Sequence, residues 1–123
     1  MRAVAKALKE FVGGFDLPAY ASDSVPDNVQ LPYLTYPVTE PEWNQKATFY
    51  IQGWYRTTNY RDLLAKADEI VREIGEGIIL SMESGSLVIY PETPLIQTMT
   101  VTEKDMKSFY INLSINAYHM PGE

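Results

Sequence analysis

Few residues in this sequence could catalyse a reaction, and they are scattered along the chain. The 123 residues include one histidine, His119, and no cysteine. General acid–base catalysis needs a histidine that a neighbouring group holds in place, whereas a residue so near the chain end usually lies in a mobile tail. The lack of cysteine excludes disulfides, thiolate nucleophiles and cysteine-based metal sites. We therefore expect no enzyme activity, no cofactor and no metal site.

Carboxylates are the second group that could do chemistry. The chain has 16 Asp and Glu against 10 Lys and Arg, a formal net charge of −6. Glu40 and Glu42 flank Pro41 in an expected loop, and Asp68 and Glu69 fall on an expected helix. Paired carboxylates can hydrolyse glycosides, but acids spread in this way are more typical of a solvated surface. An enzyme hidden among these carboxylates is one alternative, and it would need a pocket with strongly perturbed acids.

The distribution of charge and of apolar residues argues against two kinds of partner. No segment concentrates Lys or Arg, which binding to nucleic-acid phosphates requires. Apolar runs such as Ile78-Ile79-Leu80 are far shorter than the roughly 20 residues of a membrane span. We expect a soluble protein that binds no membrane and stays inside the cell that makes it.

Aromatic residues are more informative: the chain has nine Tyr, four Phe and two Trp. Residues 46–55 alternate as a half-buried strand does, which places Tyr50 and Trp54 on the face opposite Phe49 and Ile51. The same alternation in the last strand places two more tyrosines opposite the apolar residues of that strand. A polar face that carries large aromatic rings is typical of a protein interface.

This interpretation leaves two alternatives open. The aromatic face is either a contact surface for another protein, or a loop or the Pro-rich segment folds over it. Base stacking is a weaker third possibility, because basic residues do not accompany the rings. We expect this aromatic face or an exposed loop around Trp43 to supply one side of a protein contact. The candidate interface residues are Trp43, Tyr50, Trp54, Tyr110 and Tyr118.

The elements that must position these residues follow from periodicity and turn residues. Apolar spacing predicts a helix over residues 2–12 that Gly13-Gly14 ends. Prolines interrupt residues 15–44 and allow only short strands, at 17–21 and 31–38. Further predicted elements are a strand at 46–55, a helix at 59–74 that Asn59 caps, and strands at 78–82, 87–91, 95–101 and 109–118.

This order of elements predicts one domain over residues 1–123 and an α+β fold. We expect a mostly antiparallel sheet with both helices packed on one face. Residues 83–86, Glu-Ser-Gly-Ser, are the expected hairpin turn between the strands at 78–82 and 87–91.

Several segments together resemble a known family. They are the N-terminal helix ending at Gly13-Gly14, the piece Leu31-Pro32-Tyr33-Leu34-Thr35-Tyr36 after a Pro/Asp loop, the helix from Asn59 to Ile74, and the closing strand from Phe109 to Tyr118. In this order and length the chain resembles the small tail terminator proteins of long-tailed bacteriophages and prophages, which are also described as tail-completion or minor capsid proteins.

The resemblance implies a structural virion protein. Such proteins form a ring, usually of six subunits, on the last ring of the tail tube, where they stop tube growth and present a surface for the head connector. The implied partners are further copies of the chain, the tail tube protein and the head–tail connector protein. DNA would only pass through the ring, the protein would be located in the tail or neck of the virion, and assembly would take place in the cytoplasm of the host bacterium. The family has no catalytic residues to carry over to this sequence.

Two other functions remain open from the sequence. A head-side neck or completion protein would share the size and charge of a tail terminator. A stand-alone binding module could instead add a partner strand to an exposed sheet edge, and it would remain a monomer or form a simple dimer.

Overall fold

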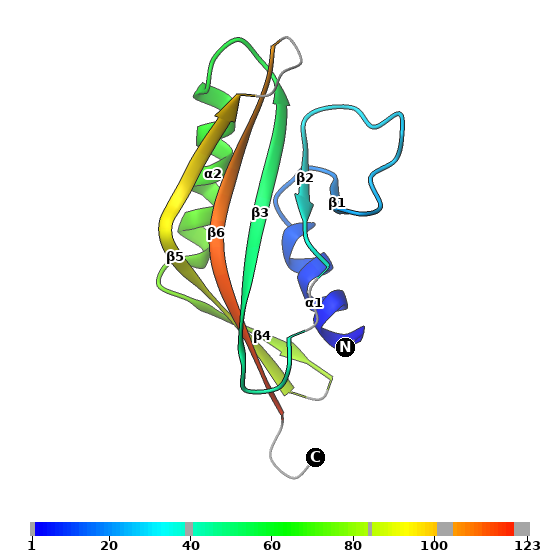
Figure 1. The fold of residues 1–123 in the computed structure, drawn as a ribbon, viewed down its shortest axis with the longest axis vertical. Coiled ribbons are helices and arrows are strands. Elements are labelled where there is room, and N and C mark those ends of the chain that lie inside the picture. The colour runs from blue at the N-terminus through cyan, green and yellow to red at the C-terminus, as the bar shows by residue number, and fades with distance from the viewer. Residues whose placement is uncertain (1, 39–40, 84, 101–104, 120–123) are drawn as a thin grey trace.

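The computed structural model describes residues 2–38, 41–83, 85–100 and 105–119. Two helices and six strands follow one another in the order α1 (Arg2–Val12), β1 (Ala19–Ala21), β2 (Tyr33–Tyr36), β3 (Lys46–Arg56), α2 (Arg61–Ile74), β4 (Ile78–Met82), β5 (Gly85–Thr100) and β6 (Met106–His119). The strands form one sheet in the order β1-β2-β3-β6-β5-β4, in which β1 and β2 are parallel and all other neighbours are antiparallel. The fold is therefore α+β, with strands dominating (Figure 1).

The centre of the sheet is the ladder between β3 and β6. Each of the 11 residues of β3 has a partner in β6. Phe49 lies opposite Leu113 and Ile51 opposite Ile111, and these four side chains are almost fully buried. Because successive side chains of a strand point to opposite faces, this register puts one apolar set from both strands into the core.

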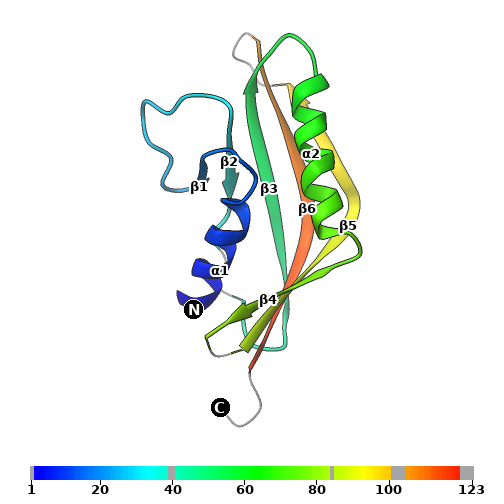
Figure 2. The same cartoon turned by 180° about the vertical axis from the view of Figure 1, so that it is seen from behind.

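Helix α2 packs against the central strands. Its buried residues recur at helical spacing (Leu63, Ala67, Ile70, Ile74), and the helix lies over β6 and β5 (Figure 2). The side-chain oxygen of Asn59 accepts a hydrogen bond of 2.9 Å from the backbone N–H of Arg61. The N-cap residue is Tyr60 and not Asn59 as predicted. Asn59 precedes the N-cap and still stabilises the start of the helix through this hydrogen bond.

Helix α1 contacts mainly β4 and β1. It ends where predicted: the N–H of Gly13 donates to the carbonyl oxygen of Lys9 over 2.9 Å. Its buried residues belong to the same apolar cluster as those of α2 and of the sheet. In Figure 2 the two helices lie over different parts of the sheet, α1 toward β1 and α2 toward β5.

The Pro-rich segment contributes two strands that are shorter than predicted. Leu34 and Ser22 donate backbone hydrogen bonds to the carbonyl oxygens of Pro18 and Tyr36, each over 2.8 Å. Prolines border both strands, and since proline has no N–H it cannot continue a ladder. The result is a short parallel pair, β1 and β2, that extends the sheet beyond β3.

The separate strands predicted at 87–91 and 95–101 are one strand, β5, so this prediction was wrong. Between Pro91 and Ile96 the register shifts, because the chain advances five residues on β5 while β6 advances only two, from Leu113 to Ile111. The extra residues form a bulge at which the strand bends but does not end. Strands β4 and β5 pair in antiparallel fashion up to Met82 opposite Gly85, so residues 85 and 86, which were predicted in the turn, belong to β5. Ser84 of the predicted turn and residue 101 of the predicted strand lie outside the described residues.

Gly53 provides a test of the packing between β3 and β6. It lies opposite Phe109, and a Cβ atom added to it would be 2.1 Å from Cε1 of the Phe109 ring. We expect Gly53→Ala to lower the free energy of unfolding by about 1–3 kcal/mol, because the ring has to leave its position. Chemical denaturation measures this, with Gly14→Ala as control, whose Cβ would meet only ordinary contacts. Equal stability of Gly53→Ala and the wild type would contradict this packing.

Tyr55 provides a second test, at the contact between β3 and α2. Burial, followed by the nearby carboxylates of Asp62 and Glu69, raises the pKa of Tyr55 from 10.0 to about 12. The unfolded chain thus releases this proton at lower pH than the folded chain, so the free energy of unfolding should fall as pH rises from about 10 to 12. Denaturation at several alkaline pH values should show a shallower decline for Tyr55→Phe. An unchanged slope would mean that Tyr55 does not resist ionisation.

Candidate protein-binding surface

The sheet face opposite the apolar cluster carries a group of rings that we call the aromatic surface, formed by Tyr20, Tyr33, Tyr50, Trp54 and Tyr110. Strand register places them together. Tyr110 pairs with Gln52, Gln52 with Thr35 and Thr35 with Tyr20, which makes one row across four strands. Tyr33, Trp54 and Ser108 make the next row. Paired residues share a face, and Tyr50 alternates in step with Gln52 and Trp54 along β3, so all five rings lie on the same side of the sheet.

The rings contact one another in two groups. Tyr50 and Tyr110 meet edge to face with centroids 5.6 Å apart. Tyr33 stacks on Trp54 at 6.3 Å with an interplanar angle of 21°, and Tyr20 meets Tyr33 edge to face at 5.8 Å. Such geometries are favoured by the ring quadrupoles and hold the side chains in defined positions.

Polar side chains on the same face form hydrogen bonds, one of which fixes Trp54. The indole Nε1 of Trp54 donates to Thr35 Oγ1 over 3.1 Å, and Gln52 Nε2 donates to Ser108 Oγ over 3.4 Å. Thr35, Gln52 and Ser108 are all buried, and burial of polar groups is tolerated when they are hydrogen-bonded. The bond to Thr35 limits the rotamers of Trp54, so a partner would meet this ring at a small cost in entropy.

The aromatic surface is uncharged and partly open. Tyr50, Trp54, Tyr110 and Tyr20 are half-buried, and Tyr33 is buried. Burial, with Tyr20 as the second cause, raises the pKa of Tyr33. Part of the Pro-rich segment lies beside β3 in the sheet, and its strands β1 and β2 enlarge the surface with two further rings.

A polar hollow of about 310 Å³ adjoins the aromatic surface at the bulge of β5. Here Asn112 Nδ2 donates to the carbonyl oxygen of Pro94 over 2.7 Å and to Gln97 Oε1 over 2.9 Å. Lys46 Nζ lies 3.2 Å from Glu92 Oε1. Hydrogen bonds from Lys46 and then from Ser114 lower the pKa of the Glu92 carboxyl. This edge of the face is therefore polar and already internally paired.

The structure brings together three of the five predicted interface residues, Tyr50, Trp54 and Tyr110. Tyr118 is 39% exposed on the same strand as Tyr110 but eight residues further on, a distance of about 26 Å along the strand. Trp43 is half-buried and packs against the apolar cluster, and its backbone forms a bridge with Ala117. The expected exposed loop around Trp43 is thus a segment attached to β6.

Two members of the aromatic surface, Tyr20 and Tyr33, were missed from the sequence. Their signal is the alternation in Tyr33-Leu34-Thr35-Tyr36, in which Leu34 and Tyr36 join the apolar cluster and Tyr33 and Thr35 face the other way. Only the pairing of β2 with β3 shows that Tyr33 lies beside Trp54.

The residues considered for catalysis do not converge. The backbone of His119 ends β6 opposite Gly85, so this residue lies in a strand and not in a terminal tail. Glu40 lies outside the described residues, and Glu42, Asp68 and Glu69 are exposed. In the part of the chain that the structure describes, no three His, Cys, Asp or Glu residues gather closely enough to hold a metal ion. Within the same residues no helix has the length and apolar character needed to cross a bilayer.

Comparison with known proteins finds a chain of similar fold but indicates no activity. No protein-family model matches the chain, and no curated protein matches it. A solved protein chain, whose name states no function, matches over 98% of this chain and 94% of its own length, with 14% sequence identity and a TM-score of 0.59. At this identity the similarity shows a shared fold alone.

The hydrogen bond between Trp54 and Thr35 is open to a double-mutant cycle. Thr35→Val removes the acceptor and Trp54→Phe removes the donor, so the two changes should be non-additive by about 1 kcal/mol in the free energy of unfolding. Thr48→Val, an exposed change on β3, serves as control and should alter stability by less than about 0.5 kcal/mol. Additive effects would show that the bond does not order the surface in solution.

Proposed function

We propose that this protein is a non-enzymatic structural component of a bacteriophage virion, a tail terminator that assembles as a ring on the tail tube. The ring, a hexamer in this proposal, ends tube growth and joins the tube to the head connector. The observation that carries the proposal is the aromatic surface, which is uncharged and partly open, and whose Trp54 is fixed by a hydrogen bond to Thr35. The order of elements that resembles the tail terminator family supports it.

The chemistry of the aromatic surface suits contact between proteins. Interface centres are enriched in Tyr and Trp and depleted in charged residues, and rigid aromatic side chains contribute a large share of binding energy. In this proposal both helices cover one face of the sheet, which leaves the opposite face for a neighbour. A ring contact is heterologous, so this surface would meet a different patch on the next copy.

The charge of the chain suits a ring through which DNA passes. A net charge of −6 repels phosphates in the absence of clustered cations, so DNA would move through without being held. The partners are then further copies of the chain, the tail tube protein and the connector, in a virion assembled in the bacterial cytoplasm. A head-side neck protein would use the same surfaces and differ only in its partners.

One observation favours a second candidate, a stand-alone module that binds a partner by strand addition. Strand β4 lies at the edge of the sheet, and its Ile79 side chain is 72% exposed. An exposed edge strand can pair with an extended segment of another protein. Such a module would be a monomer or a dimer and would form no ring.

Solution mass and particle shape distinguish the two candidates. We expect light scattering over a concentration series to show a defined oligomer, and negative-stain images of it to show a closed ring with a central hole. Tyr110→Ser should raise the midpoint concentration of assembly about tenfold or more without changing the thermal unfolding temperature, because it removes a ring from the surface and leaves the core intact. Tyr118→Ser is the matched control, a tyrosine on the same strand outside the aromatic surface.

Equal assembly of Tyr110→Ser and Tyr118→Ser would remove the aromatic surface from the contact. A protein that stays monomeric at every concentration would support the binding module in place of the ring.

A further inference from the structure

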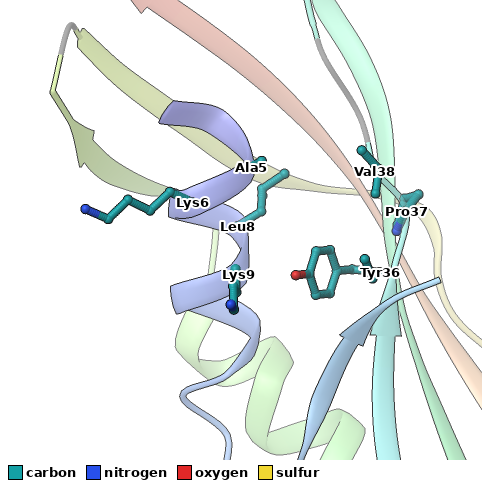
Figure 3. A pocket seen from close by; sticks show the side chains of 8 residues that line it. Ala5, Lys6, Leu8, Lys9, Tyr36, Pro37 and Val38 are labelled. Atoms are coloured by element: carbon teal, nitrogen blue, oxygen red, sulfur yellow. The ribbon is translucent and has the colours of Figure 1, made fainter. Parts of the chain in front are cut away.

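A groove of about 340 Å³ opens between α1 and the end of β2 (Figure 3). Its volume is in the range of pockets that hold small molecules. Because Tyr36 belongs to the apolar cluster, the groove lies on the sheet face opposite the aromatic surface. Most of its lining is apolar and comes from α1, from β1 and from the end of β2 with the residues that follow it (Ala5, Leu8, Ala21, Tyr36, Pro37, Val38).

The hydroxyl of Tyr36 is a polar group without a partner in this groove. Tyr36 is only 7% exposed, and its hydroxyl points across the groove toward α1 (Figure 3). No hydrogen bond joins this hydroxyl to any residue that the structure describes. Burial, followed by the carboxylate of Asp23, raises the pKa of Tyr36, so the hydroxyl keeps its proton. Because buried polar groups are normally hydrogen-bonded, an acceptor that enters the groove would supply the missing partner.

Lys9 adds a positive charge on the helix side of the groove. It is exposed, and within the described ranges no carboxylate forms an ion pair with it. The second lysine of the lining, Lys6, extends away from Tyr36 (Figure 3). Lys6 also lines a separate hollow with Glu10 and Glu83, whose carboxylates offset its charge. Since no Asp or Glu lines the groove itself, Lys9 is the charge that a bound group would meet.

We infer that this groove binds a small carboxylic acid with an apolar tail, of the size of a medium-chain fatty acid. The tail lies against the apolar lining, and the carboxylate accepts hydrogen bonds from Tyr36 Oη and Lys9 Nζ. One hydroxyl and one ammonium group match a single negative charge, whereas phosphate is commonly held by bidentate arginine, which the lining lacks. The apolar lining supplies affinity, and the two polar groups fix the orientation of the ligand. This inference does not depend on the proposed ring.

Calorimetric titration with octanoate tests the inference, with two probes that each lack one half of the ligand. Octan-1-ol has the tail without the charge, and acetate has the charge without the tail. We expect octanoate to bind about tenfold or more tightly than either probe, because only octanoate combines apolar burial with a hydrogen bond between charged groups.

Variants of the two polar groups locate the carboxylate. Tyr36→Phe and Lys9→Gln should each weaken octanoate binding about fivefold or more, since each removes one donor. Lys9→Gln should also leave octanol binding unchanged, so that the preference for octanoate is lost. Tyr110→Phe and Lys46→Gln are the matched controls, because both side chains lie on the opposite face of the sheet, and they should bind octanoate like the wild type.

A third variant tests the position of the tail. Val38 is 56% exposed, so Val38→Asp should retain the fold while it places a negative charge at the groove. It should weaken octanoate binding about tenfold or more. Leu64→Asp, an exposed leucine of α2 that does not line the groove, is the matched control. Thermal unfolding of each variant checks that the fold is retained.

Three results would overturn the inference. The first is a wild-type chain that does not bind octanoate. The second is equal affinity for octanoate and octanol, which would mean that the groove recognises apolar surface alone. The third is octanoate binding that stays unchanged in both Tyr36→Phe and Val38→Asp, because the ligand would then lie elsewhere on the protein.

Discussion

The ladder between β3 and β6 is the constraint on which the other features of this protein depend. It pairs every residue of β3 with a residue of β6. This register decides which alternate side chains of the two strands face the apolar cluster and which face the other way. Gly53 belongs to this constraint, because only a residue without a side chain leaves room for the Phe109 ring opposite it. A shift of register by one residue would exchange the two faces, which would expose the Phe and Ile side chains and bury the tyrosines.

The two faces of the ladder serve different purposes. One face contributes Phe, Ile and Leu side chains to the apolar cluster, which also includes buried residues of both helices. The other face carries the rings, together with hydrogen bonds between neighbouring strands from Trp54 to Thr35 and from Gln52 to Ser108. The structure also has two exposed lysines beside the groove of α1 and an edge strand, β4, with an exposed isoleucine.

Much of the fold could be predicted from the sequence, and the misses have identifiable causes. The boundaries of α1 and the assignment of β3 and β6 as strands followed from local periodicity, which can be read within each segment without knowing its partners. Strand β5 was expected as two strands because Pro91 and Pro94 break the local pattern. In the fold the continuous partner β6 holds both halves in one ladder across the bulge. Trp43 was expected in an exposed loop, because no pattern in the nearby residues indicates that its backbone forms a bridge with Ala117.

The sequence by itself determined which side chains of β3 and β6 share a face, because alternation is a property of the extended chain. It also determined the scarcity of catalytic groups and the acidic balance. Only the tertiary structure decided that the Pro-rich segment pairs with β3, which brings Tyr20 and Tyr33 to Trp54, and that α1 encloses a groove with Val38. These are contacts between residues far apart in the chain. Their partners are selected by burial of the common apolar cluster, and no local pattern of residues encodes that choice.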